Sequence, residues 1–209
     1  MNYNKRIMQV KSRSGLAIAL SKLKVFENVN IKLEQYPTDS EIASEILWDA
    51  YMKGDIVDKT IADLGAGTGI LGIGALLLGA KSVEFVEIDT AAFEILKQNT
   101  VDFENIKLLN MNINEYNKKT DVIIQNPPFG TRDKHIDKIF LEKAMELSNT
   151  IYSFHKTSTI KYIKKIIEKN DFKVIEQKDF LFPIKKIQKQ HKRKIHRIEV
   201  SVLKIVKRI

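Results

Sequence analysis

Apolar positions in the central part of the chain follow two alternating patterns. Short β-branched runs are separated by longer segments in which apolar residues recur at helical spacing. The predicted strands are 59–64, 82–88, 106–111, 121–125 and 151–154, and the predicted helices are 70–80, 90–103, 137–150 and 157–170. This alternation predicts an α/β fold, in which a mostly parallel, Rossmann-like sheet carries helices on both faces.

The N-terminal part has a different pattern. Residues 1–34 form a basic, amphipathic stretch that predicts a helical extension, with three leucines at helical spacing: Leu16, Leu20 and Leu23. Thr38–Glu41 reads as a capping box, which opens a helix that continues to about Tyr51 and ends at Gly54. This helix precedes the first predicted strand.

The C-terminal part also departs from the alternation. Segments 172–182 and 198–206 look like two long strands with no helix between them. They are expected to pair as an antiparallel hairpin at the end of the sheet, within residues 172–209. Since no repeat, linker or low-complexity block divides the chain, residues 1–209 are expected to form a single domain.

A glycine-rich turn follows the first strand, in the sequence IADLGAGTGILGIG. Glycines at such a turn let a ligand approach the backbone and the amides at the helix start. Gly67, Gly69 and Gly72 satisfy the dinucleotide fingerprint, with Glu87 at a suitable distance for a ribose. However, the order Asp-x-Gly-x-Gly-x-Gly resembles the first motif of S-adenosylmethionine-dependent methyltransferases. A nicotinamide enzyme would also need a substrate domain, for which the chain has almost no room, so S-adenosyl-L-methionine is the preferred cofactor.

Two carboxylates end the second strand. Glu87 is assigned to the ribose hydroxyls, whereas Asp89 is left between a ligand role and the N-cap of the next helix, for which Thr90 is the other candidate.

The stretch DVIIQNPPFG places Asn126 at the end of a buried strand, because Pro127 removes a backbone donor. Ligands of open α/β sheets collect at the carboxyl ends of strands, so this position favours chemistry. The alternative interpretation is a proline turn capped by Asn126, with Phe129 in the core.

Composition narrows the candidate chemistry. The chain has 209 residues and no cysteine, and its four histidines are scattered, so a thiolate or zinc site is not expected and no metal is assigned. No apolar run is long enough to span a bilayer, and the protein is expected to be soluble and cytoplasmic. A net charge of +9 favours a nucleic-acid partner, although an AT-rich genome would also enrich lysine. Seven basic residues without an acidic one crowd the predicted hairpin connection: Lys185, Lys186, Lys189, Lys192, Arg193, Lys194 and Arg197.

The Asn126-Pro127-Pro128-Phe129 sequence resembles the fourth motif of methyltransferases that act on planar nitrogens: adenine N6, guanine N2 or protein glutamine. In such a motif the asparagine oxygen and the first proline carbonyl accept the two N–H groups and aim the nitrogen lone pair at the methyl group. The second proline keeps that carbonyl rigid, and Phe129 offers a face for an extruded base.

Five segments together resemble the methyltransferase-like protein five family, which methylates adenine N6 of small-subunit ribosomal RNA, and its archaeal relatives: LEQYPTD, ADLGAGTGILGIGALLLGA, VEID, NPPFGT and SFHKTST. The resemblance implies a class I methyltransferase fold and the product S-adenosyl-L-homocysteine. It also implies a cofactor site formed by Gln35, Thr38, Asp63, Gly65, Gly67, Thr68, Gly69, Ile70, Glu87, Asn112 and Ile113. The family often has Asp where Asn112 stands.

The resemblance also suggests macromolecular contacts. His155 and Lys156, expected in a loop after the fifth strand, are candidate RNA contacts. The basic connection supplies further candidates for phosphates, namely Lys189, Lys192, Arg193 and Lys194. A small zinc-ribbon activator protein is implied at the exposed edge strand 106–111. Guanine N2, protein glutamine and a non-catalytic RNA-binding assembly factor stay open as alternatives.

Overall fold

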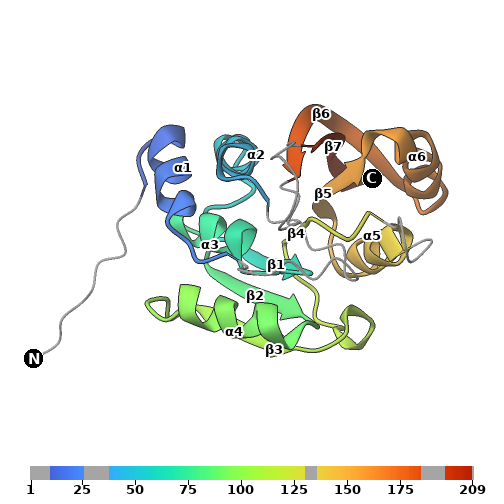
Figure 1. The fold of residues 1–209 in the computed structure, drawn as a ribbon. Coiled ribbons are helices and arrows are strands. Elements are labelled where there is room, and N and C mark those ends of the chain that lie inside the picture. The colour runs from blue at the N-terminus through green and yellow to red at the C-terminus, as the bar shows by residue number, and fades with distance from the viewer. Residues whose placement is uncertain (1–9, 26–37, 130–135, 185–195, 209) are drawn as a thin grey trace, which may run out of the picture.

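The computed structural model describes residues 10–25, 38–129, 136–184 and 196–208. Strands and helices alternate in this part of the chain as the sequence predicts (Figure 1). The strands are β1 (Thr60–Leu64), β2 (Ser82–Glu87), β3 (Ile106–Asn110), β4 (Val122–Gln125), β5 (Thr150–Lys156), β6 (Phe172–Ile184) and β7 (His196–Lys207). The α-helices are α1 (Arg13–Ser21), α2 (Ser40–Met52), α3 (Ile70–Leu77), α4 (Thr90–Asn99), α5 (Ile136–Leu147) and α6 (Ile160–Lys169), and two 3-10 turns are η2 (Ile113–Glu115) and η3 (Thr157–Thr159).

The strands form one sheet in the order β3-β2-β1-β4-β5-β7-β6. The first five of these are parallel, whereas β7 runs antiparallel to both β5 and β6. The chain moves outward in one direction from β1 to β3 and then returns to place β4 on the other side of β1. At this switch point the carboxyl ends of the strands leave a crevice where ligands bind.

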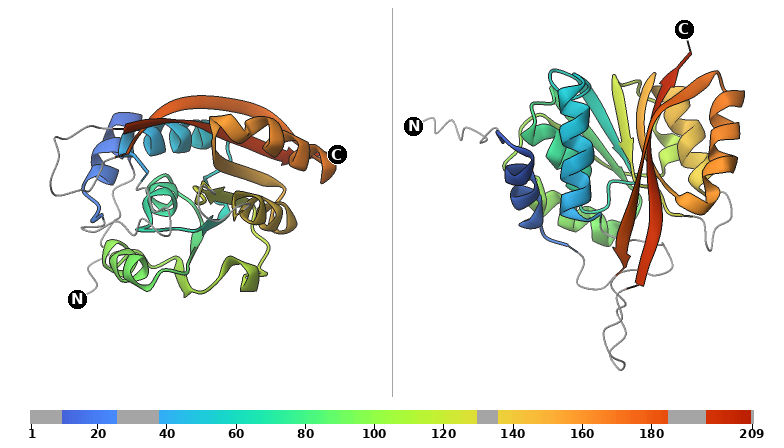
Figure 2. Two further views of the ribbon diagram at one scale, coloured as in Figure 1. Left: turned by 45° about the vertical axis from the view of Figure 1, so that its right-hand side comes forward. Right: turned by 90° about the horizontal axis from the view of Figure 1, so that it is seen from above.

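Helices cover both faces of the sheet (Figure 2, right). One face packs against α1 to α4 and the other against α5 and α6, and each side has its own apolar core. The predicted α/β fold and the predicted antiparallel C-terminal hairpin are therefore confirmed. No helix in the described ranges is both long and apolar enough to cross a bilayer.

The start of α2 differs from the prediction. Asp39, not Thr38, is the N-cap, and its Oδ1 accepts hydrogen bonds from the amides of Glu41 and Ile42 at 2.9 and 3.3 Å. Both residue types are good caps, so the sequence alone does not choose between them. This arrangement leaves the Thr38 hydroxyl available for a different contact.

The β6–β7 hairpin is longer than the strand it joins. Pairing between β5 and β7 stops at Lys156 and Val200, whereas β6 and β7 stay paired as far as Ile184 and His196. The hairpin therefore projects beyond the carboxyl edge of the parallel strands (Figure 2, right). Of the basic residues in its connection, Arg197 belongs to β7 and is exposed, whereas the other six lie outside the described residues.

Candidate active site

The glycine turn joins β1 to α3 with three residues in the left-handed region. The φ angles of Gly65, Gly67 and Gly69 are +68°, +57° and +93°, which side chains rarely adopt. A Cβ added to Gly69 would lie 2.5 Å from Leu96 Cδ1, but one added to Gly67 would meet nothing within 4 Å. Gly67 is therefore the point at which open space reaches the backbone of the turn.

Two further glycines serve packing. A Cβ on Gly72 would lie 2.3 Å from Phe85 Cε1, and one on Gly74 would lie 2.4 Å from Leu47 Cδ1. Gly72 completes the dinucleotide fingerprint in the sequence, yet the contact with Phe85 already accounts for its lack of a side chain. The structure thus removes the main support for the dinucleotide interpretation.

Asp63 supports the turn from inside the protein. Its side chain is buried, and Oδ2 accepts a hydrogen bond from the Gly72 amide at 2.8 Å. Burial raises the pKa of Asp63 to about 7; the Gly72 bond opposes this shift and the nearby Glu87 carboxylate adds to it. Asp63 was expected among the cofactor ligands, and the contact that the structure shows instead ties β1 to α3.

Glu87 joins the end of β2 to the glycine turn. Oε2 accepts from the Gly67 amide and Oε1 from the Asp89 amide, both at 2.7 Å. Burial raises the pKa of Glu87, while these backbone bonds act in the opposite direction. Each carboxylate oxygen keeps a second lone pair that a hydroxyl group can use.

Asp89 has a structural role that the sequence left open. It is the N-cap of α4, and its Oδ1 accepts from the Ala92 amide at 2.7 Å. Asn112 has a comparable role, because its Oδ1 accepts from the Asn114 amide at 2.9 Å at the start of η2. Ile113 is buried beside it. The oxygen of Asn112, expected to bind adenine, is thus already engaged by the backbone and has one lone pair left.

Asn126 lies directly after β4, at the carboxyl edge of the sheet. Its Nδ2 donates a hydrogen bond of 3.0 Å to Thr38 Oγ1. This bond fixes the orientation of the amide, and Oδ1 is a buried oxygen without a hydrogen-bond partner among the residues that the structure describes. An unpaired buried acceptor costs about 1–3 kcal/mol and calls for an explanation. A substrate N–H group would supply the missing donor.

Phe129 lies three residues further on and is only 7% exposed. Its ring packs with the core on the α1–α4 side of the sheet. Stacking on an extruded base therefore requires the chain around the ring to move.

His155 is placed wrongly by the sequence prediction. It belongs to β5 and not to the following loop, and it is 1% exposed. Its Nε2 lies 2.8 Å from Ser153 Oγ, which also accepts a 2.9 Å bond from Gln125 Nε2. Burial lowers the pKa of His155 to about 3, so the ring is neutral at physiological pH. A neutral buried ring does not contact RNA on the surface, whereas Lys156 ends β5 and is half-buried.

Gln125 and Ser153 were not expected to be of interest. The two residues are register partners on adjacent strands and are completely buried. With His155 they form a buried polar row at the carboxyl ends of β4 and β5. Polar residues in two otherwise apolar strands were the only available signal.

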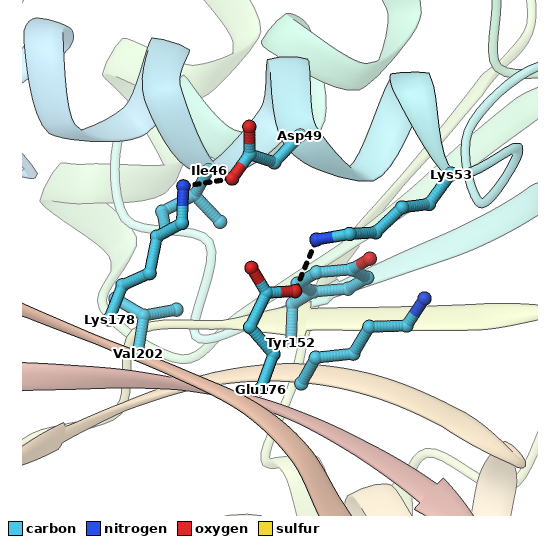
Figure 3. Close-up of a pocket in the computed structure, with 8 residues that line it drawn as sticks. Ile46, Asp49, Lys53, Tyr152, Glu176, Lys178 and Val202 are labelled. Atoms are coloured by element: carbon cyan, nitrogen blue, oxygen red, sulfur yellow. Dashed lines mark hydrogen bonds and ion pairs between the residues drawn. The ribbon is translucent and has the colours of Figure 1, made fainter.

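A small charged pocket lies elsewhere, between α2 and the β6–β7 hairpin (Figure 3). Lys178 pairs with Asp49, and Lys53 pairs with Glu176 across it. These ion pairs connect the hairpin to α2. The pocket is lined by Ile46, Asp49, Lys53, Tyr152, Glu176, Lys178, Val202 and Lys204, none of which belongs to the predicted site.

The remaining predicted residues divide into two groups. Thr68 is buried and Ile70 is half-buried at the start of α3, next to Gly67. Gln35 and the basic residues Lys189, Lys192, Arg193 and Lys194 lie outside the described residues.

Comparisons with known proteins agree with this geometry. A family described as the methyltransferase small domain matches residues 38–150. The rRNA N(6)-adenosine-methyltransferase METTL5 of Danio rerio is 36% identical over 200 residues, which cover 90% of this chain and 96% of the fish protein. The chain belongs to the METTL5 family.

Archaeal relatives extend the comparison. The uncharacterized protein MJ0284 of Methanocaldococcus jannaschii is 35% identical over 208 residues, covering 93% of this chain and 94% of that protein. The crystal structure of PH1948 from Pyrococcus horikoshii, described as a candidate RNA methyltransferase, has a TM-score of 0.88 and 44% identity and covers 94% of this chain and 98% of its own. The likeness to these archaeal proteins thus extends over nearly the whole chain.

Proposed function

We propose that the protein transfers a methyl group from S-adenosyl-L-methionine to the N6 atom of an adenosine in RNA. The observation that carries this proposal is the Asn126 amide, because its donor side is bound to Thr38 and its buried oxygen has no partner in the described part of the chain. The names of the METTL5 relatives support rRNA as the substrate class. The proposal also includes small-subunit rRNA as the substrate, the cytoplasm as the place of action, and a single domain formed by residues 1–209.

The residues of the glycine turn fit the cofactor. Gly67 offers backbone beside open space, and Glu87 has free lone pairs for two ribose hydroxyls. The rest of the cofactor site would be lined by Thr68, Ile70, Asn112 and Ile113. Gln35 would close over it. When bound, S-adenosyl-L-methionine supplies an electrophilic methyl group and leaves as S-adenosyl-L-homocysteine.

The residues of this chain would align the acceptor nitrogen with the methyl donor. Asn126 Oδ1 accepts one N–H of the adenine amine, and the Pro127 carbonyl accepts the other. The amine nitrogen then approaches tetrahedral geometry, and its lone pair points toward the methyl donor. Because Pro127 and Pro128 have no N–H, no backbone donor there competes for the substrate. After transfer the nitrogen is cationic and loses a proton, so no strong base is required.

Replacement of Asn126 by alanine tests the mechanism. Single-turnover methylation of RNA should slow by at least about a hundredfold, by analogy with the loss of one transition-state hydrogen bond. Affinity for S-adenosyl-L-homocysteine, measured by calorimetry, should stay the same, because Asn126 contacts the acceptor. Near wild-type turnover in this variant would reduce Asn126 to a turn cap and overturn the proposal.

A protein glutamine is the second candidate acceptor. The observation that favours it is a similarity to MJ0928 of Methanocaldococcus jannaschii, described as a candidate protein N5-glutamine methyltransferase. It is 31% identical over 123 residues, which cover 54% of this chain and 59% of that protein. Labelled S-adenosyl-L-methionine incubated with ribosomal subunits or with release factor separates the two. Label in rRNA supports the adenosine proposal, and label only in protein contradicts it.

The proposal includes two macromolecular contacts. Basic residues in the hairpin connection would bind RNA phosphates, namely Lys189, Lys192, Arg193 and Lys194. The position of the hairpin supports this contact, because β6 and β7 end beyond the edge of the sheet that carries the candidate site. Lys156 would contribute at the end of β5.

A small zinc-ribbon protein is proposed at β3. This strand is at the edge of the sheet, as expected, and its backbone can accept a further strand. A stable, active and monodisperse protein purified alone would contradict a requirement for such a partner.

A further inference from the structure

Helix α6 has an unusual charge. It contains four lysines and one glutamate, whereas α2 contains three acidic residues and no lysine, and α5 contains two lysines and three acidic residues. The positive charge of the described helices is therefore concentrated on α6.

The lysines of α6 also differ in their partners. Lysines of α4 and α5 form ion pairs within their own helices, as in Lys97–Glu94, Lys138–Glu142 and Lys143–Glu146. Lys161 and Lys165 form no ion pair with any residue of the described ranges, and the same holds for Lys169. Glu168 is the one acidic residue of α6, and no salt bridge joins it to any of these three lysines.

The three residues form one stripe. Lys161, Lys165 and Lys169 are four residues apart, so they share a face of the helix with a rise of about 6 Å per step. All three are exposed, whereas the isoleucines of the opposite face, Ile163 and Ile167, are completely buried against the sheet. Because the isoleucine face is covered and Tyr162 is the one large apolar side chain of α6 that is exposed, the stripe suits a polyanion better than a membrane.

The stripe begins at the edge of the sheet that carries the candidate active site. α6 follows β5 through η3, and β5 pairs with β4, which ends next to Asn126. Figure 1 shows α6 beside β5, on the side of the sheet that α5 also covers. The stripe then runs away from this edge toward Lys169.

We propose that Lys161, Lys165 and Lys169 contact the phosphates of RNA that flanks the target adenosine. This inference rests on the proposed function, because it requires an RNA substrate. It adds a binding surface on described residues, separate from the basic connection of the hairpin.

The test combines K161Q, K165Q and K169Q in one variant. Binding to an rRNA fragment with the target adenosine is measured by fluorescence anisotropy across a salt series. Each lost phosphate contact to single-stranded RNA flattens the slope of log K against log salt by about 0.7, so the slope should change by about 2. The matched control combines K11Q, K81Q and K119Q, which removes the same charge from exposed lysines on other parts of the surface.

Each outcome has a separate meaning. A normal slope in the stripe variant, or equal losses in both variants, overturns the stripe while leaving the methyltransferase proposal intact. Absence of RNA binding and methylation in the unmodified protein contradicts the proposed function itself. The variant with arginine at the same three positions keeps the charge, and recovery of the slope there shows that charge and not the fold was lost.

Discussion

Thr38 and Asn126 are 88 positions apart, yet one hydrogen bond joins them at the candidate site. The hydroxyl of Thr38 holds the amide of Asn126 so that its oxygen is left for the substrate. At the scale of single residues, the chemistry depends on this orientation.

Replacing Thr38 by valine removes the hydroxyl and keeps the shape of the side chain. Loss of one hydrogen bond of about 0.5–1.5 kcal/mol should slow methyl transfer by about twofold to thirteenfold. Single-turnover rates measure this effect. In the control Asp39→Ala, loss of the helix cap should lower the free energy of unfolding by about 0.5–2 kcal/mol, while the rate of methyl transfer stays close to that of the unmodified protein. Equal effects of both variants on the rate would argue against an orienting role for Thr38.

Asp63 gives a prediction for pH. Its folded pKa of about 7 is above the unfolded value, so between about pH 4 and 7 the unfolded chain is ionised while the folded protein keeps the proton. Stability therefore falls as pH rises through this window, by about 1.4 kcal/mol per unit, and the cost is complete above pH 7. The Asp63→Asn variant keeps an acceptor for the Gly72 amide and lacks this cost.

Urea unfolding of Asp63→Asn and the unmodified protein at several pH values checks this expectation. The stability difference should grow in favour of the variant from pH 4 to 7. A stability difference that stays constant from pH 4 to 7 would show that folding does not raise the pKa of Asp63.

At the scale of elements, the glycine turn combines ligand access with packing. Gly67 lies beside open space, whereas Gly72 contacts Phe85. Neither role is visible in the sequence, where both glycines belong to the same motif.

Alanine at these two positions should affect different properties of the protein. Gly72→Ala forces a Cβ to within 2.3 Å of Phe85 and should lower the melting temperature strongly. Gly67→Ala adds about 1 kcal/mol of backbone strain and should mainly weaken binding of S-adenosyl-L-homocysteine. Calorimetry and thermal unfolding of both variants separate the effects. Weaker cofactor binding in the Gly72 variant with no change in stability would contradict this division.

The sequence predicted elements better than contacts. Hydrophobic spacing depends on neighbouring residues, so the strands and helices around the glycine turn and Asn126 were located correctly. The Thr38–Asn126 bond and the row from Gln125 to His155 depend on which strands become neighbours. His155 was misplaced because the β-branched signal of β5 fades before the strand ends.

At the scale of the whole molecule, polar contacts tie the hairpin to the rest of the fold. The Tyr152 hydroxyl on β5 donates a 2.5 Å hydrogen bond to Asp55, which follows α2, and Lys204 on β7 pairs with the same carboxylate. Burial, the hydrogen bond to Asp55 and the negative charge of that carboxylate raise the pKa of Tyr152, so the hydroxyl keeps its proton.

Replacing Tyr152 by phenylalanine should lower the free energy of unfolding by about 1.5–3 kcal/mol, because a bond to a charged group is lost. Denaturant unfolding measures this loss, and affinity for S-adenosyl-L-homocysteine should not change. The control Tyr51→Phe should have little effect. A large loss of cofactor affinity in Tyr152→Phe would show that this contact reaches the active site.

The projecting β6–β7 hairpin also bears on how such proteins can diversify. Beyond Lys156 and Val200 the described residues of its two strands pair only with each other, so insertions or deletions between the strands do not shift the register of the main sheet. Recognition of new substrates can therefore evolve at this tip while the catalytic edge is inherited unchanged. For an engineer, the same tip is the natural place to graft a foreign RNA-binding segment.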